Sequence, residues 1–432
     1  MAKVVEKLRL IRICLVSKPQ QPNYNSNSTE TLYTKDAFVK RIQLSTLFSS
    51  QNQLADHMES CHKHPLHPFL FVLFLCMFFF FAEAAGASIK QRPFNNKVSA
   101  GFVFGDSTVD PGNNNYVKTF FRSNFPPYGK DLKDQTATGR FTNGKLPTDL
   151  IVSYIGIKEY LPPYLDPTLG IEELMTGVSF ASAGSGFDPL TPQITSVVSI
   201  PKQVEYFKEY KKRLQSAIGK KRMEHIIQNA VFLVSAGTND FVVNYFTIPI
   251  RRKNYTVSAY QQFILQNVKQ LLQDLWDEGA RRIAVTGLPP MGCLPVVITL
   301  NSPNAILERG CIEKFSRVGM EYNQMLQNEV NSMRGRLAHL GAKILYVDIF
   351  TPLVDMIQGL GKLDFDEVSQ GCCGSGYLEA GFLCNPGSYV CFDASKYVFF
   401  DSIHPTEKTY TKLFMANHHV VDSVIQDWDL ND

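Results

Sequence analysis

Ala100-Gly-Phe-Val-Phe-Gly-Asp-Ser-Thr-Val109 is the stretch that decides the fold of this 432-residue chain. Its first five residues, 100–104, are apolar enough to form a buried strand, and they run directly into Gly-Asp-Ser. A serine just past the end of a strand can expose its hydroxyl at the rim of a sheet, where α/β enzymes place nucleophiles. Because Gly-Asp-Ser also occurs in ordinary turns, Ser107 indicates chemistry only if partners for it lie elsewhere in the chain.

Apolar runs of strand length alternate with segments of helical period along the rest of the chain. Helices are predicted from about Pro201 onward, from about Ser258 to Glu278, and from about Ile312 to Leu340. This alternation favours parallel strands with helices on both faces, so the expected fold class is α/β, a three-layer α/β/α sandwich. Its mainly parallel sheet would have five strands, at residues 100–104, 177–180, 230–235, 282–286 and 343–347.

The partners for Ser107 occur near the far end of the chain, in Asp401-Ser-Ile-His404-Pro405. A serine hydroxyl does not ionise at neutral pH and needs a neighbouring base, which His404 can supply because histidine titrates near that pH. Asp401 would orient the imidazole ring and stabilise its charged form. A capped turn before Pro405 explains His404 alone more simply, but the three residues together predict a catalytic triad for acyl transfer.

Four segments carry a more specific pattern. They are Phe104-Gly-Asp-Ser-Thr-Val-Asp-Pro-Gly-Asn-Asn-Asn115, Gly177-Val-Ser-Phe-Ala-Ser-Ala-Gly184, Val234-Ser-Ala-Gly-Thr-Asn-Asp240 and Asp401-Ser-Ile-His404-Pro-Thr406. In this order and spacing they resemble the blocks of the GDSL esterase/lipase family, also called SGNH hydrolases. Two further segments, 139–145 and 287–295, are similar to the secreted plant branch of that family. The resemblance covers residues 100–406, which makes chance a poor explanation.

The resemblance implies a flavodoxin-like arrangement of the sheet and an oxyanion hole beside the triad. Its donors would be the backbone N–H groups of Ser107 and Gly184 and the side-chain amide of Asn239. Considered singly, Asn239 also fits an Asx-turn that closes a strand, and Gly184 also fits a left-handed turn. The chain departs from many family members at Ser179, where they carry asparagine, and the Ser179 hydroxyl is expected to support the turn instead.

The expected function is that of a secreted serine esterase or lipase, which hydrolyses carboxylic esters through an acyl-enzyme. Two alternatives remain open: acyl transfer to an alcohol at the same site, and a non-catalytic protein that binds wall or surface lipids. The substrate would be a small ester or lipid, bound by a monomer without a metal or other cofactor. Nucleic-acid binding is not expected, since the formal charge is only +3. Loops at 116–128, 187–199 and 241–250 are expected to line the acyl pocket.

The N-terminal region resembles a secretion signal that begins in an unusual place. Residues 69–81 form an unbroken apolar run, too short to span a bilayer, and small residues follow it. The run lies far from Met1 but at a normal distance from Met58. We therefore expect residues 1–57 to be an unstructured extension absent from the native protein, 58–87 to be a signal peptide and 88–432 to be the catalytic domain. A basic targeting extension is the alternative for residues 1–57.

The cysteines of the catalytic region fit an oxidising compartment. Six of the nine cysteines lie there, namely Cys293, Cys311, Cys372, Cys373, Cys384 and Cys391. Cys293 is expected to pair with Cys311, while Cys372 and Cys373 are expected to pair with Cys384 and Cys391 in either combination. A zinc site is less favoured, because adjacent cysteines lack the usual two-residue gap.

Asn254-Tyr-Thr256 is a candidate glycosylation site.

Overall fold

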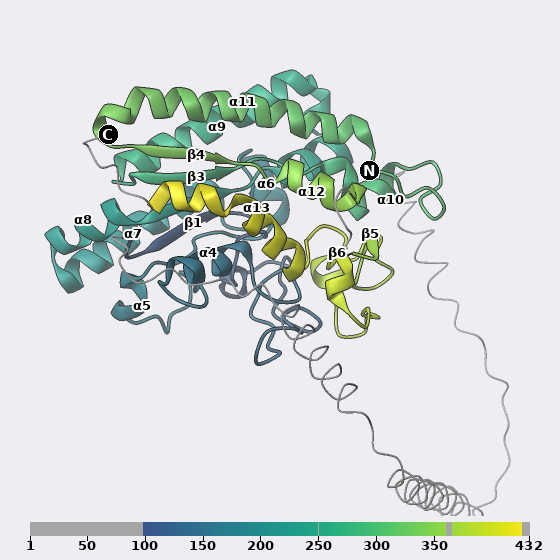
Figure 1. Ribbon diagram of the computed structural model, residues 1–432, viewed down its shortest axis with the longest axis horizontal. Coiled ribbons are helices and arrows are strands. Elements are labelled where there is room, and N and C mark those ends of the chain that lie inside the picture. The colour runs from purple at the N-terminus through teal and green to yellow at the C-terminus, as the bar shows by residue number, and fades with distance from the viewer. Residues whose placement is uncertain (1–97, 249, 360–364, 426–432) are drawn as a thin grey trace, which may run out of the picture. The chain divides into compact units, whose positions relative to one another are not determined.

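The central sheet of the computed structural model has four parallel strands in the order β1-β2-β3-β4 (Figure 1). The strands are β1 (Gly101–Gly105), β2 (Val231–Ser235), β3 (Arg282–Thr286) and β4 (Lys343–Val347). The structure describes residues 98–248, 250–359 and 365–425. The predicted N-terminal extension (1–57) and signal peptide (58–87) lie outside the described residues, as do both ends of the predicted catalytic domain.

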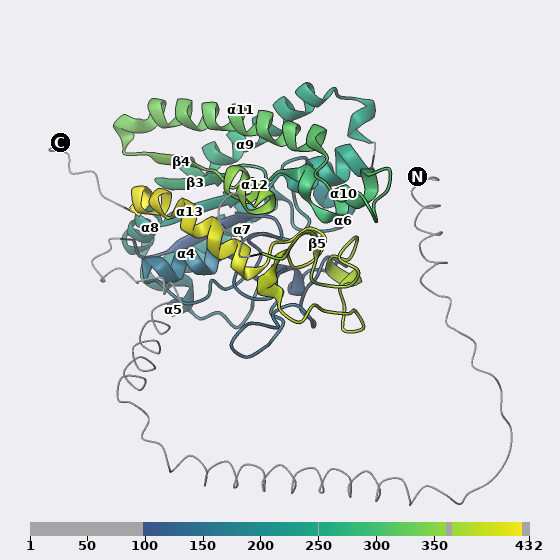
Figure 2. The ribbon, with the colours of Figure 1, turned by 45° about the vertical axis from the view of Figure 1, so that its right-hand side comes forward.

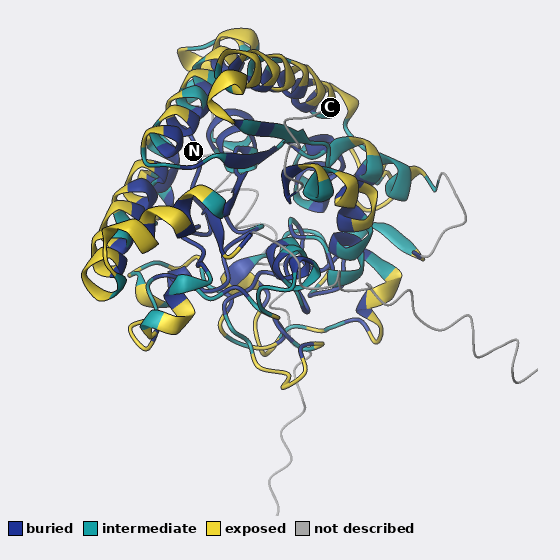
Figure 3. Ribbon diagram, turned by 60° about the vertical axis from the view of Figure 1, so that its left-hand side comes forward, coloured by how far each residue is buried: buried dark blue, intermediate teal, exposed yellow. Residues whose placement is uncertain are grey.

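Aromatic side chains fill one face of the sheet. Successive strand residues point to opposite faces, so Phe102 and Phe104 of β1 share a face with Phe232 of β2. Their rings pack against Phe207 of α7 (Ile200–Ile218). Two other long helices, α9 (Val257–Asp277) and α11 (Glu313–Leu337), also cover this side, and their outer surfaces are exposed (Figure 3).

Smaller apolar side chains line the opposite face of the sheet. Val103, Leu233 and Ala284 of three neighbouring strands form a buried cluster with Val152 of α4 (Pro147–Ile155). The last helix, α13 (Glu407–Ile425), lies along the same face next to α4 (Figure 2). Helices therefore cover both faces of a parallel sheet, and the predicted three-layer α/β/α sandwich is confirmed.

The predicted helices are present, and local sequence explains their ends. Helix α7 has Pro201 in its first turn, where a missing N–H costs nothing, and the Ser199 side chain accepts a hydrogen bond from Lys202 N. Helix α9 is followed closely by Gly279, whose φ of 107° lies in the left-handed region. Helix α11 continues into a short 3-10 turn, Ala338–Leu340, and ends at Gly341.

The fifth predicted strand, residues 177–180, is not a regular strand. It lies parallel to β1, and Phe180 N donates to Val103 O over 2.8 Å, but the pairing is a single isolated bridge at Ser179. On its other edge the segment bonds to residues 162–164, because Ser179 N donates to Pro162 O and Ser179 O accepts from Tyr164 N. The regular sheet therefore has four strands, with this segment beside β1 in the position that a flavodoxin-like order requires.

A second, two-stranded sheet was not predicted from the sequence. It pairs β5 (Glu367–Gly371) with β6 (Tyr397–Phe399). β5 is mostly polar and β6 has only three residues, so neither shows a strand period in the sequence. The remaining α-helices are α5 (Ile171–Met175), α6 (Leu190–Thr195), α8 (Lys220–Asn229), α10 (Pro295–Asn301) and α12 (Phe350–Gln358). None of the helices in the described ranges has the length and hydropathy needed to cross a membrane.

Candidate active site

Ser107 lies two residues after the end of β1, at the carboxyl edge of the sheet. The chain leaves β1 through Gly105, whose φ is 151° and where a Cβ would collide with the carbonyl oxygen of Ser235 on β2. Glycine is therefore required at this turn. The next residue is tied to the same carbonyl, because Asp106 N donates to Ser235 O over 3.0 Å. The end of β1 is thus held against β2, and Ser107 borders a cavity at this edge.

The structure brings Ser107, His404 and Asp401 together in the geometry of a catalytic triad. His404 Nε2 lies 2.8 Å from Ser107 Oγ, and His404 Nδ1 lies 2.7 Å from Asp401 Oδ2. Since a carboxylate only accepts, Nδ1 donates its proton to Asp401 and leaves the Nε2 lone pair to accept the serine hydroxyl. Ser107 and His404 are 7% and 4% exposed and Asp401 is fully buried, so little water competes for these bonds.

The Asp401–His404 pair is built into one short turn. Asp401 Oδ1 accepts hydrogen bonds from the backbone N–H groups of Ile403 and His404, at 2.8 and 2.7 Å. His404 Nδ1 lies 2.9 Å from this oxygen as well as 2.7 Å from Oδ2, so the carboxylate holds both the turn and the imidazole ring. Opposite this turn, the ring of Phe141 packs on the His404 ring with centroids 4.9 Å apart. The orientation of the imidazole is therefore set from two sides.

The three expected oxyanion donors come from three adjacent loops. Asn239 follows β2 and borders the same cavity as Ser107. Its side-chain amide donates to Ser185 O over 2.9 Å, which links it to the loop that carries Gly184. That loop is tied to the end of β1, because Ser182 N and Ser185 Oγ both donate to Gly105 O. Among the described residues, the backbone N–H groups of Ser107 and Gly184 have no hydrogen-bond acceptor.

Polar side chains after Ser107 hold these loops in place. Asp110 accepts from Gly112 N and Ala183 N, and the Asn113 side chain donates to the carbonyls of Ser179 and Ala181. The Ser179 hydroxyl donates to Val109 O over 2.9 Å, which is the support expected of it at this departure from the family pattern. The loop after β1 and the loop after residue 180 therefore form one hydrogen-bonded unit.

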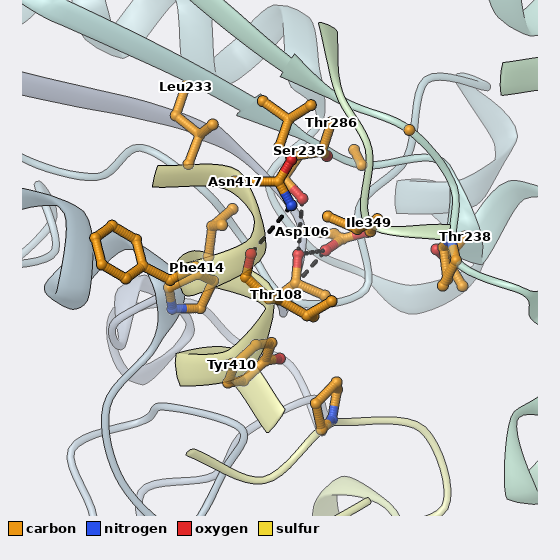
Figure 4. Close-up of a pocket in the computed structure, with 18 of the residues that line it drawn as sticks. Asp106, Thr108, Leu233, Ser235, Thr238, Thr286, Ile349, Tyr410, Phe414 and Asn417 are labelled. Atoms are coloured by element: carbon orange, nitrogen blue, oxygen red, sulfur yellow. Dashed lines mark hydrogen bonds between the residues drawn. The ribbon is translucent and has the colours of Figure 1, made fainter. Parts of the chain in front are cut away.

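A buried carboxylate lies beside the triad without being part of it. Asp106 accepts from the backbone N–H and the hydroxyl of Thr108, and that hydroxyl also bonds to Ser235 (Figure 4). Burial raises the pKa of Asp106 to about 6, although the bonds to Thr108 and the proximity of His404 partly oppose this rise. The negative field around His404 therefore depends on pH within the neutral range.

Comparison with known proteins agrees with this geometry. The sequence matches the family of GDSL-like lipases/acylhydrolases over residues 102–417. The chain belongs to this family. A GDSL esterase/lipase of Arabidopsis thaliana is 60% identical over 343 residues, which cover 79% of this chain and 91% of that relative. Two others from Arabidopsis thaliana are 43% and 46% identical, over 83% and 71% of this chain and 96% and 85% of their own lengths. As a GDSL family member, the protein is a carboxylic ester hydrolase.

Sequence reasoning missed Tyr128, which contacts the triad of this GDSL hydrolase directly. Its hydroxyl donates to Asp401 Oδ2 over 2.8 Å and accepts from Gly381 N over 2.8 Å. Burial first, and then the adjacent carboxylate, raise the pKa of Tyr128 well above its usual value, so the hydroxyl stays a donor at neutral pH. The sequence contains no periodic or motif signal for this role, because Tyr128 and Asp401 are 273 residues apart.

Three disulfides lie in the described part of the GDSL hydrolase. They link Cys293 to Cys311, Cys372 to Cys391 and Cys373 to Cys384, which decides the pairing left open by the sequence. The weaker zinc interpretation of the last four cysteines is therefore wrong. These four cysteines form a buried cluster with Tyr128, Phe141 and Phe400, directly behind the triad. Within the described residues, no group of histidine, cysteine and carboxylate side chains could hold a metal ion.

Proposed function

We propose that this GDSL hydrolase cleaves esters through a covalent acyl-enzyme on Ser107. The observation that carries the proposal is the 2.8 Å separation between Ser107 Oγ and His404 Nε2, with Asp401 on the other ring nitrogen. His404 takes the hydroxyl proton as Ser107 Oγ attacks the carbonyl carbon of the ester. Asp401 stabilises the imidazolium that results.

The remaining steps release first the alcohol and then the acid. Protonated His404 gives its proton to the alcohol oxygen as the bond between that oxygen and the acyl carbon breaks. A water molecule then attacks the acyl-enzyme, gives a proton to His404 Nε2 and releases the acid, and Ser107 regains its proton. The backbone N–H groups of Ser107 and Gly184 and the amide of Asn239 would stabilise the oxyanion, at about 3 kcal/mol for each donor.

Active-site labelling with a fluorophosphonate tests this proposal, because the reagent reacts only with an activated serine. Wild-type protein should be labelled on Ser107 and should hydrolyse a simple ester such as p-nitrophenyl acetate. A non-catalytic lipid-binding protein would show neither reaction. An acyltransferase would be labelled too, but with an added alcohol it would form mainly a new ester rather than free acid.

We also propose that the enzyme is secreted into the extracellular space or cell wall. Three disulfides support this location, since such bonds persist in oxidising compartments. The glycosylation candidate Asn254 is exposed, just after a short 3-10 turn, where an oligosaccharide would meet no obstacle. Treatment of native protein with an N-glycosidase should lower its mass, and Asn254→Gln should abolish that change. An unchanged mass would remove Asn254 as a glycosylation site.

A further inference from the structure

An apolar cavity of about 140 Å³ lies between the sheet and helix α13 and extends from Ser107 (Figure 4). Its walls are the sheet face that carries Leu233 and Ala284, and the side of α13 that carries Leu413 and Phe414. No residue of the three loops expected to line the acyl pocket, at 116–128, 187–199 and 241–250, borders this cavity. Protein interiors are normally packed without voids of this size, so a cavity here indicates a ligand-binding site.

The cavity is polar at one end and apolar at the other. Helix α13 begins at Glu407, just after the triad turn, and ends at Ile425 beside Val231, the first residue of β2. The cavity follows β2 from Ser235 at the active-site end to Val231, a distance of about 13 Å at the usual rise of a strand. The hydroxyls that border it, including those of Ser107, Thr108 and Ser235, gather at the active-site end.

Tyr410 adds an unsatisfied donor at this polar end. It lies in the first turn of α13, is 3% exposed, and its buried hydroxyl has no hydrogen-bond partner among the described residues. A buried unpaired hydroxyl is unfavourable, so it indicates a ligand that brings an acceptor. Burial, and then the charges of Asp106 and Asp401, raise the pKa of Tyr410 well above its usual value, which keeps the hydroxyl protonated.

We propose that this cavity binds the acyl chain of the substrate, with the ester group at Ser107 and the chain running along β2 beneath α13. The inference rests on the proposed function of Ser107. An ester has the required distribution of polarity, since its oxygens can accept from Tyr410 while its alkyl chain contacts only apolar walls. A cavity of roughly 150 Å³ accommodates benzene, so a straight chain of about six to eight carbon atoms would fill this one.

A chain-length series of p-nitrophenyl esters tests the cavity. Wild-type kcat/KM should be at least tenfold higher for the hexanoate or octanoate than for the acetate or the palmitate. Ala284→Leu places a larger side chain into the cavity from β3, so the ratio of kcat/KM for hexanoate to that for acetate should fall at least tenfold. Ala416→Leu is the matched control, because Ala416 is exposed on α13, and its ratio should equal that of wild type.

The outcomes separate this inference from the proposed function. If Ala284→Leu is labelled and active but keeps the wild-type ratio of kcat/KM for hexanoate to that for acetate, the acyl cavity is overturned. The proposed serine esterase would then still stand. Protein that is neither labelled nor active on any ester would overturn both. If Ala284→Leu does not fold, product inhibition of the wild type decides: hexanoate should inhibit at concentrations at least tenfold below acetate, and equal inhibition would overturn the cavity.

Discussion

The hydroxyl of Tyr128 donates to the same oxygen of Asp401 that accepts the Nδ1 proton of His404, at 2.8 and 2.7 Å. This shared acceptor connects the triad to the disulfide-rich segment behind it, because Gly381 N in turn donates to Tyr128. The Tyr128 hydroxyl bonds to Asp401 and Gly381, not to Ser107. It is a positioning residue, which acts by holding the Asp401 carboxylate at the angle that His404 requires.

Tyr128→Phe should lower kcat by about tenfold or more, since a hydrogen bond to a charged group contributes about 1.5–3 kcal/mol. KM for a short ester should change less than twofold, because the ring stays in its buried cluster and the substrate site is untouched. Steady-state kinetics on p-nitrophenyl acetate would measure both constants. Tyr389→Phe, at an exposed tyrosine, is the control. Equal kcat in the two variants would remove Tyr128 from the mechanism.

Ser107→Ala should reduce kcat by about 10³-fold or more while the protein remains folded. His404→Ala should lose a similar factor, because the two side chains act as one unit. Asp401→Asn should be less severe, since part of the catalysis survives when the orienting group is lost. Thermal unfolding of each variant would show that the fold is intact. Turnover of Ser107→Ala within tenfold of wild type would exclude it as the nucleophile.

Removal of the Cys372–Cys391 disulfide should lower both stability and turnover. Replacement of both cysteines by serine should cost about 3 kcal/mol in the free energy of unfolding, the usual effect for a loop of this size. Because this bond packs against the cluster that holds Tyr128, kcat should fall as well. The matched control is the Cys293–Cys311 pair, which closes a loop of similar length outside that cluster. Removal of Cys293–Cys311 should affect stability more than kcat. Denaturant titration and steady-state kinetics would measure both quantities for the two disulfide variants.

Asp240→Asn should stabilise the protein relative to wild type, and this gain should be larger at alkaline than at acid pH. Burial raises the pKa of Asp240 to about 7, although hydrogen bonds from Thr191 and two backbone N–H groups partly offset this effect. The folded state therefore binds a proton that the unfolded state, with a pKa of about 4, has released, and wild-type stability falls as pH rises from about 4 to 7. The variant lacks this penalty. Its gain in the free energy of unfolding over wild type should be larger at pH 8 than at pH 4.

Asp188→Asn should change the stability with the opposite pH dependence. Burial would raise the pKa of Asp188, but hydrogen bonds from Arg251, Leu190 N and Tyr260 outweigh it and lower the pKa below its usual value. The stabilisation from this carboxylate is therefore present above about pH 4 and lost as pH falls through the folded-state pKa. The variant should lose more stability at pH 8 than at pH 3. An identical pH trend in the two variants would contradict both assignments.

N-terminal sequencing of protein from its native source should begin near Ala85 or Ser88. The physical reason is that the apolar run at 69–81, preceded by Lys63 and followed by small residues, has the order that secretion requires when synthesis starts at Met58. Recovery of mature protein that begins before Met58 would show that residues 1–57 belong to the native chain.

Much of the fold could be predicted because its signals are local. A buried parallel strand is a short apolar run, and an amphipathic helix repeats its apolar residues every three or four positions, so β1 to β4 and the long helices α7, α9 and α11 were visible in the sequence. Residues 177–180 looked like a strand for the same reason. In the structure they pair with β1 through one bridge, and Ser179 also bonds to the segment at 162–164, a contact that no local pattern reveals.

The sequence by itself determined which residue types carry the chemistry, because Ser107 and the Asp401–His404 turn each lie in short local motifs. Only the tertiary structure decided what surrounds them. The bond from Tyr128 to Asp401, the choice between the two cysteine pairings, and the cavity under α13 all join residues far apart in the chain. The physical reason is that hydrogen bonds, disulfides and voids depend on distances across the folded core, and those distances are set only when the layers of the sandwich pack together.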